Sequence, residues 1–229
     1  MPLTLTHFYE SEKGSIYKRK TAMSSLPNLT LQNKHVRLEL SSLTHVKGLQ
    51  KATAAGELWK LWYTTVPTVD GMAAEIERRL DLFATGKMIP FTVIRTENGM
   101  DEIVGMTSFM NIEQTPTYAR VEIGSTWYSP VVQRTILNTA VKHLMLEYAF
   151  EQWKVLAVDF RTHRLNTQSR QAIERLGAQL DGIIRSHSIM PNGTVRDTAV
   201  YSIIASEWAT TKVHLEFKMA QILNKSTVK

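Results

Sequence analysis

The sequence predicts a single mixed α/β domain in which a mostly antiparallel central sheet carries helices on both faces. The 229 residues fit one domain, because a single core can grow to roughly 250 residues before chains divide. Hydrophobic residues make up 43% of the chain, which is enough to fill such a core. The apolar residues switch repeatedly between the period of a strand and that of a helix, and elements in that order build a layered sheet.

The first part of the chain predicts an extension, a strand and two helices. Residues 1–28 show no usable apolar period, and we expect a flexible extension there. Residues 35–40 alternate apolar and polar side chains, as a half-buried strand does. Two helices follow, the first capped by Thr44 and the second capped by Thr68 or Asp70 and ended by Gly86.

A meander of three antiparallel strands is predicted next. An Asn-Gly pair between two apolar runs is the strongest short signal for a hairpin. The expected strands are residues 90–95, 102–110 and 120–127, with the hairpin turn at Asn98-Gly99.

The second half of the chain predicts helices and strands in alternation. A long helical stripe covers residues 132–150, and a buried strand covers residues 155–160. The next expected elements are a helix at 169–176 stopped by Gly177, strands at 178–184 and 195–203, and a helix that begins at Ser206. We therefore expect a domain over residues 29–210 and a C-terminal helix over residues 206–229.

Composition restricts the chemistry that the chain can perform. There is no cysteine, which excludes disulfides, thiolate metal sites and cysteine nucleophiles. No histidine or carboxylate spacing suggests a metal site either. The net charge of +6 favours anionic partners, but no run of five like charges occurs, so we do not expect nucleic acid binding. No apolar stretch reaches the ~18 residues of a membrane span, and no signal peptide opens the chain, so a cytoplasmic location is expected.

Several segments resemble the GNAT acetyltransferases, whose order of elements is also the order predicted here. Residues 166–178, NTQSRQAIERLGA, are similar to the family's N-x-x-S segment and the helix that follows it. Glu122-Ile123-Gly124 with Trp127-Tyr128 resembles the end of the family's central strand. Asp197 and the segments at 201–203 and 206–208 resemble the RimJ/RimL-type branch, which acetylates α-amino ends of ribosomal proteins and other amines. The resemblance implies a GNAT-like fold, with acetyl-CoA as the acyl donor and an amine as the acceptor.

The loop that binds the cofactor pyrophosphate departs from the family pattern. GNAT proteins read Q/R-x-x-G-x-G/A there, whereas Ile136 and Asn138 replace the two small residues in this chain. A helix N-terminus still offers free N–H groups and a positive dipole end to phosphates, although the segment also fits an ordinary helix start. The resemblance implies cofactor contacts from Trp127, Tyr128, Gln133, Arg134, Thr135, Ile136, Leu137, Asn138, Thr139, Asn166 and Arg170.

Amide formation requires a neutral amine and a group that takes up its proton. Glu122 lies on the strand that should border the cleft and is our candidate base; alternatively it is a solvated strand carboxylate. The resemblance implies that Ser169 protonates the leaving thiolate and that Asn166 binds the pantetheine arm. Both residues also suit a helix cap, and capping is the preferred interpretation for Ser169.

Other residues fit a site less specifically. Arg134, Lys142 and Arg170 could reach nucleotide phosphates, but basic residues on helices are usually solvated. His163 and His187 could line the acceptor site, though a structural role is commoner. Trp59, Trp62 and Tyr63 could wall the cleft, or they could belong to the core.

The function that these observations predict is transfer of an acetyl group from acetyl-CoA to a primary amine, on a protein N-terminus or a small molecule. The alternative is a non-catalytic GNAT-like binding module that contacts protein or RNA, favoured by the missing glycines and the basic pI. A small nucleic-acid-binding protein ranks last, because no basic stripe with interleaved aromatics is present. The acceptor and the choice between monomer and homodimer stay open.

Overall fold

A computed structural model describes residues 29–97, 100–115 and 117–227. The extension expected at residues 1–28 and the turn expected at Asn98-Gly99 lie outside these residues. The described chain forms one sheet of eight strands in the order β1-β2-β3-β4-β5-β6-β8-β7. The strands are β1 (Thr30–Gln32), β2 (Val36–Leu40), β3 (Met88–Glu97), β4 (Met100–Gln114), β5 (Ala119–Tyr128), β6 (Ala157–His163), β7 (Gln179–Ile189) and β8 (Val195–Ile204).

The sheet is mostly antiparallel, as predicted. Only β5 and β6 run parallel, and every other neighbouring pair is antiparallel within the described residues. The meander of β3, β4 and β5 is confirmed. The short strand β1, which pairs with β2, was not predicted, because three residues are too few to show a period.

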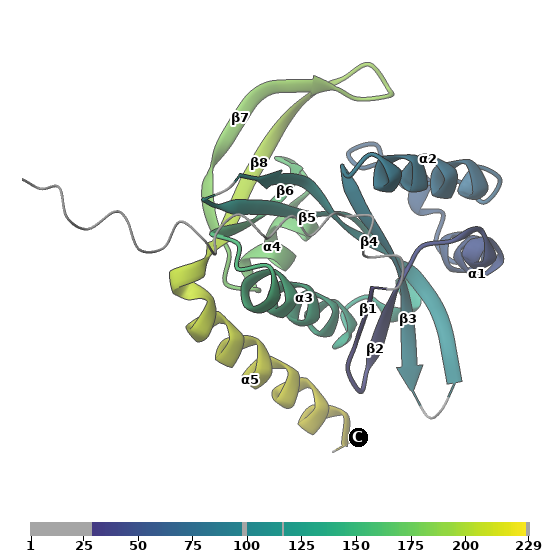
Figure 1. The fold of residues 1–229 in the computed structure, drawn as a ribbon. Helices are drawn as coiled ribbons and strands as arrows, with labels where there is room; N and C mark the ends of the chain where they lie inside the picture. Colours follow the sequence, from purple (N-terminus) through teal and green to yellow (C-terminus); the bar gives the residue numbers. More distant parts are fainter. Residues whose placement is uncertain (1–28, 98–99, 116, 228–229) are drawn as a thin grey trace, which may run out of the picture.

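Helices cover both faces of the sheet (Figure 1). They are α1 (Val46–Ala54), α2 (Met72–Ala84), α3 (Leu137–Glu147), α4 (Thr167–Glu174) and α5 (Trp208–Thr227). Residues of α1 and α2 form a smaller core cluster with Met106 and Trp127. Residues of α3, α4 and α5 join the larger cluster on the other face. Within the described part of the chain, no helix is long and apolar enough to cross a membrane.

The helix stops were predicted more accurately than the helix starts. Gly86 and Gly177 follow α2 and α4 with positive φ angles of 73° and 97°, which glycine adopts most easily. The cap expected at Thr44 is wrong, and Thr68 caps only the turn that leads into the second helix. A 3-10 turn capped by Ser42 leads into α1, and the cap position of α2 is Gly71, whose N–H donates to Thr68 Oγ1.

The long helix expected at residues 132–150 is shorter than predicted. A 3-10 turn (Pro130–Val132) and a loop precede α3, and a π-helical turn (Tyr148–Gln152) follows it. Arg134 has a φ of 61°, which interrupts a right-handed helix. The helix expected at 169–176 begins earlier, at Thr167.

Strands β5 and β6 pair at one end and then diverge, and we call this arrangement the fork. Their pairing covers only Arg120–Glu122 against Ala157–Asp159, although β5 continues to Tyr128 and β6 continues to His163. A register shift in β5 lies beyond this point, where Ser125 has a φ of 49°. Such a bulge bends a strand away from its neighbour. Among the residues that the structure describes, the β5 edge beyond Glu122 has no strand partner on the β6 side.

Candidate active site

Glu122 lies at the vertex of the fork, where β5 and β6 last pair. Its side chain is buried, and only 5% of the residue surface is exposed. Asn111 Nδ2 donates to Glu122 Oε2 over 2.7 Å, and Arg161 Nε lies 3.4 Å from the same oxygen. Burial raises the pKa of Glu122, while the Asn111 hydrogen bond and the Arg161 charge oppose this rise. A carboxylate whose pKa is raised toward neutrality suits proton transfer.

Asn111 reaches Glu122 because β4 is irregular at this point. The register between β4 and β5 shifts between Met110 and Glu113, and Asn111 has a φ of 47°. Asparagine tolerates this left-handed conformation better than most residues, and a bulge redirects a side chain. The sequence interpretation missed Asn111, because the predicted strand ended at Met110.

Arg161 brings positive charge to the other side of Glu122. Its Nη2 lies 3.8 Å from Asp159 Oδ2, but Arg120 Nε also donates to both Asp159 oxygens, at 3.0 and 2.9 Å. Asp159 is therefore neutralised mainly by Arg120. The sequence could have indicated this group, because Asp159, Arg161 and His163 alternate along β6. The pattern was missed because the predicted strand ended at Phe160.

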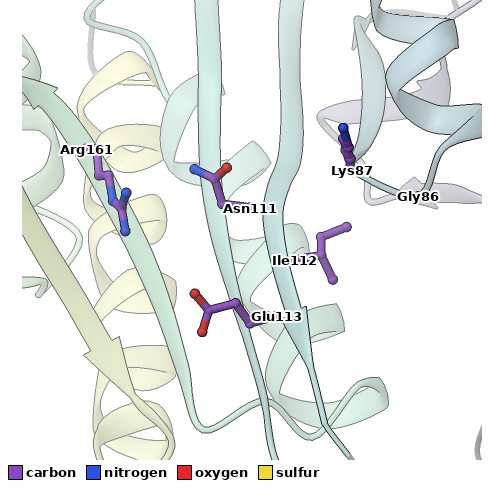
Figure 2. A pocket seen from close by; sticks show the side chains of 6 residues that line it. All are labelled: Gly86, Lys87, Asn111, Ile112, Glu113 and Arg161. Atoms are coloured by element: carbon purple, nitrogen blue, oxygen red, sulfur yellow. The ribbon is translucent and has the colours of Figure 1, made fainter. Parts of the chain in front are cut away.

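A cavity of about 420 Å³ opens beside this group. Figure 2 shows the side chains that line it. They are Gly86, Lys87, Asn111, Ile112, Glu113 and Arg161. Because Asn111 and Arg161 both contact Glu122, the cavity adjoins the candidate base.

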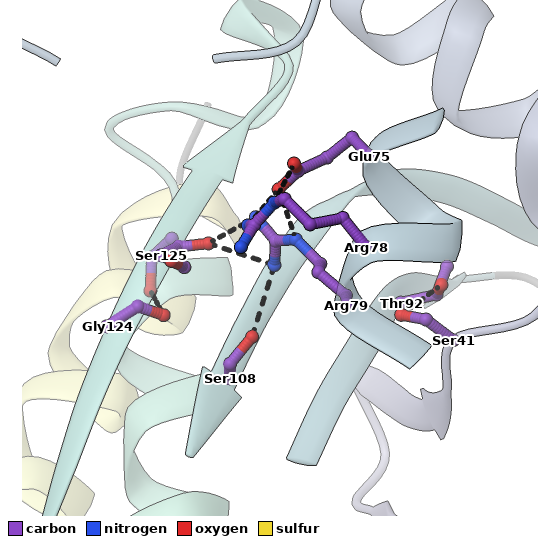
Figure 3. Close-up of polar contacts among 9 residues, drawn as sticks. Ser41, Glu75, Arg78, Arg79, Thr92, Ser108, Gly124 and Ser125 are labelled. Atoms are coloured by element: carbon purple, nitrogen blue, oxygen red, sulfur yellow. Dashed lines mark hydrogen bonds and ion pairs between the residues drawn. The ribbon is translucent and has the colours of Figure 1, made fainter. Parts of the chain in front are cut away.

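Arg79 of α2 holds the β5 bulge from one face of the sheet (Figure 3). Its Nη1 donates to Ser108 Oγ over 3.1 Å, and its Nη2 donates to the Ser125 carbonyl over 3.3 Å. Its Nε donates to Glu75 Oε1 over 2.7 Å. A left-handed residue such as Ser125 persists where surrounding contacts fix it. The sequence could have indicated this role, because Arg79 lies within the apolar stripe of α2 and follows Glu75 by four residues, the spacing of an ion pair on a helix.

Lys142 of α3 supports the same bulge from the opposite face. Its Nζ donates to Thr126 Oγ1 at 2.9 Å and to Thr107 Oγ1 at 3.2 Å. Thr126 Oγ1 in turn donates to the Gly124 carbonyl over 3.3 Å. Burial lowers the pKa of Lys142 to about 7. The interpretations of Lys142 as a phosphate contact or a solvated residue are wrong, because its side chain points into the protein.

The start of α3 has the features of an anion site. The structure shows no side-chain cap at Ile136, and Thr135 Oγ1 accepts the N–H of Leu137 over 3.2 Å. The other N–H groups of the first turn include those of the half-buried Asn138 and Thr139, and such groups have no partner within a helix. Ile136 is only 8% exposed. Its side chain is therefore buried and leaves the surface of this turn open.

Gln133 links the three segments predicted to hold the cofactor. Its Nε2 donates to the Tyr128 carbonyl over 3.0 Å, and its Oε1 accepts from Gln168 Nε2 over 3.4 Å. The end of β5, the loop and the start of α4 are thereby brought together. Arg134, in the same loop, is exposed.

Asn166, and not Ser169, caps α4. Asn166 Oδ1 accepts the backbone N–H of Ser169 over 3.0 Å, so the interpretation of Ser169 as the cap is wrong. Ser169 lies in the first turn and is half-buried. Its role as proton donor stays a prediction, as does pantetheine binding by the Asn166 amide. Arg170 Nε donates to Tyr201 Oη over 2.8 Å, which anchors it to β8.

Trp127 and Tyr128 point to opposite faces of the sheet. Trp127 belongs to the core cluster under α1 and α2, and Tyr128 packs against the larger cluster. Trp127 Nε1 and Tyr128 Oη are buried without a hydrogen-bond partner in the described structure, and burial raises the pKa of Tyr128. Their side chains pack in the protein interior, so a cofactor would meet their backbone at the open β5 edge.

His163 and Trp62 lie together near the end of β6. His163 Nδ1 accepts the Leu165 N–H over 3.0 Å, and burial lowers the pKa of His163. Trp62 is 46% exposed and packs edge-on against His163, with the ring centroids 5.2 Å apart. Trp62 is thus not a core residue. His187 Nδ1 contacts Thr198 Oγ1 at 2.9 Å on the β7–β8 hairpin.

Comparisons with known proteins identify the family of the chain. A family model described as an acetyltransferase (GNAT) domain matches residues 36–179. No curated protein sequence matches the chain.

Solved structures share the fold. A GCN5-related N-acetyltransferase from Brucella melitensis is 26% identical, with a TM-score of 0.72 over 82% of this chain and 84% of that chain. RimJ from Mycobacterium smegmatis, in complex with CoA-disulfide, is 16% identical with a TM-score of 0.69 over 85% and 96%. A GNAT-family acetyltransferase from Bacillus anthracis is 18% identical, with a TM-score of 0.62 over 78% and 100%.

Proposed function

Because the chain belongs to the GNAT acetyltransferase family, we propose that it transfers the acetyl group of acetyl-CoA to a primary amine held beside Glu122. The observation that carries this proposal is the position of Glu122. It lies between the open edge of β5 and a cavity lined by its own partners Asn111 and Arg161. The donor and the acceptor would therefore approach the same carboxylate from two sides.

The donor side offers groups that suit the parts of acetyl-CoA. The N–H groups at the start of α3 suit the pyrophosphate, and the exposed Arg134 lies in the loop just before them. The unpaired edge of β5 beyond Glu122 presents backbone donors and acceptors to the amides of an extended pantetheine arm. The structure of RimJ with CoA-disulfide supports placing the donor on this fold.

Glu122 would act on the acceptor amine. The amine nitrogen forms the new C–N bond to the acetyl carbonyl carbon as the C–S bond breaks, and Glu122 Oε accepts the amine proton. The thiolate takes a proton from water, or from the hydroxyl of Ser169, which then regains a proton from solvent. Glu122 releases its proton to solvent before the next turnover. Arg79 and Lys142 hold the adjoining bulge from both faces, which would keep the β5 edge in one conformation for the thioester.

The non-catalytic alternative rested on Ile136 and Asn138 in the phosphate loop. Burial of the Ile136 side chain speaks against a steric block at the first of these two positions. The basic charge of the chain is equally compatible with a donor that carries phosphates.

Calorimetric titration with acetyl-CoA tests the donor site. We expect specific binding in the micromolar range, about −8 kcal/mol. Ile136→Ala should keep the dissociation constant within about threefold, because the Ile136 side chain is buried, while losing about 2–4 kcal/mol of stability through the cavity left behind. No heat and no thermal shift at millimolar acetyl-CoA would contradict the proposal.

A further inference from the structure

Basic side chains lie around the cavity beside Glu122. Lys87 and Arg161 line it, and Arg196 of β8 interacts electrostatically with Glu122. The opposing carboxylates are Glu113, in the lining, and Glu122 itself. The nearby Asp159 is held mainly by Arg120, at 3.0 and 2.9 Å, and lies farther from Arg161, at 3.8 Å.

These cations keep capacity for another partner. Within the described part of the chain, Arg161 Nε is buried without a hydrogen bond of good geometry, although it lies 3.4 Å from Glu122 Oε2. Arg196 Nε donates to Thr198 Oγ1 over 2.9 Å, and burial lowers the pKa of Arg196. Among the described residues, neither Arg196 nor Lys87 forms an ion pair with a carboxylate.

The neighbouring strands extend this charge. Arg164 and Arg185 share the single carboxylate of Asp197, at 3.3 and 2.9 Å. Two guanidinium groups on one carboxylate leave a net positive charge beyond the end of β6. A substrate carboxylate that enters the cavity would meet the side chains of Lys87 and Arg161, and such cations attract anions.

We propose that the acceptor is an amine that carries its own carboxylate, with Arg161 and Lys87 holding the carboxylate while the amine faces Glu122. This inference rests on the proposed function and narrows its substrate class. Arginine binds carboxylates through a planar pair of N–H donors. A volume of about 420 Å³ suits a small molecule or the first residues of a peptide. Free amino acids and peptides that begin with an acidic residue share this chemistry, whereas polyamines and aminoglycosides lack it.

Matched acceptor pairs test the inference. One pair is a peptide with N-terminal aspartate and the same peptide with N-terminal asparagine; the other is a free amino acid and its amide. Spermidine represents the polycations. A thiol reagent reports released CoA without background from the protein, because the chain has no cysteine.

We expect the carboxylate member of at least one pair to have a kcat/KM at least tenfold higher, and that pair identifies the source of the carboxylate. Equal kcat/KM values within both pairs, or the highest kcat/KM with spermidine, would overturn the inference. The proposed acetyl transfer would still stand. If none of these acceptors causes release of CoA although acetyl-CoA binds, both the proposed function and this inference are wrong.

Charge reversal at Lys87 locates the carboxylate subsite. Lys87 is exposed, so Lys87→Glu should fold normally, raise KM for the carboxylate acceptor about tenfold and reduce the preference within the pair. Lys51→Glu makes the same change on the exposed part of α1 and should leave the preference unchanged.

Arg161→Gln is the second test. A preference that survives in both Lys87→Glu and Arg161→Gln would show that these residues do not hold the carboxylate.

Discussion

Replacing Glu122 with glutamine is expected to lower turnover by about 10²-fold, within the range of general acid–base catalysis. Glutamine keeps the shape of the side chain and can still accept the hydrogen bond from Asn111, but it cannot take up a proton. The affinity for acetyl-CoA should stay nearly constant, because Glu122 lies at the vertex of the fork and not at the start of α3.

The pH profile gives this experiment a second readout. A base works in its deprotonated form, so wild-type activity should rise with pH as Glu122 ionises. Because burial raises the Glu122 pKa, this limb is expected above the usual range for glutamate, and Glu122→Gln should lack it. Glu77→Gln makes the same chemical change on the exposed surface of α2 and serves as the control. Wild-type turnover in Glu122→Gln at every pH would rule Glu122 out as the base.

Replacing Lys142 with methionine is expected to stabilise the protein by a few kcal/mol near pH 7. The buried ammonium has hydroxyl partners, Thr107 and Thr126, but no carboxylate partner in the described structure. Its pKa falls from 10.5 to about 7, which corresponds to a burial cost of about 5 kcal/mol at ~1.4 kcal/mol per unit. Methionine has similar length and no charge, and the two threonine hydroxyls, 2.8 Å apart, can still bond to each other.

The sign of the pH dependence follows from the lowered pKa. Between about pH 7 and 10.5 the unfolded lysine holds a proton that the folded lysine has lost, so wild-type stability rises with pH across this window. Below about pH 7 both states are protonated and the cost is fully present. The advantage of Lys142→Met, measured by denaturant unfolding, should therefore be largest at or below pH 7 and shrink toward pH 10.5.

An exposed lysine provides the control for this measurement. Lys34→Met removes a solvated charge and should show no such trend. A stability difference between Lys142→Met and wild type that is constant from pH 6 to pH 10 would contradict the account of Lys142 as a buried amine with a low pKa.

Most of the fold could be predicted because local patterns and global architecture agree. The alternation at residues 35–40 and the stripe of Leu137, Val141, Leu144 and Met145 both mark faces that are buried in the structure. Helix starts were less accurate, because backbone conformation decided them. Arg134 at positive φ delays α3, and nothing in the local apolar period signals that.

The sequence predicted only those parts of the site that a single residue and its own strand or helix can indicate. Glu122 could be placed from its strand, but its partners come from distant segments. Asn111 depends on a bulge in β4, and Arg79 crosses from α2 to the Ser125 carbonyl. Lys142 was misread because a lysine on a helix is usually solvated. Contacts of this kind depend on strand register and helix orientation, which periodicity does not reveal.

The most direct test of the central claim is to follow both products of one reaction. The purified protein is incubated with acetyl-CoA and the best acceptor of the matched pairs. Free CoA is quantified with a thiol reagent, and the acetylated acceptor is identified and quantified by mass spectrometry. The account predicts equal amounts of free CoA and singly acetylated amine, with both falling together in Glu122→Gln. CoA released without an acetylated amine, or no release beyond the protein-free rate, would contradict it.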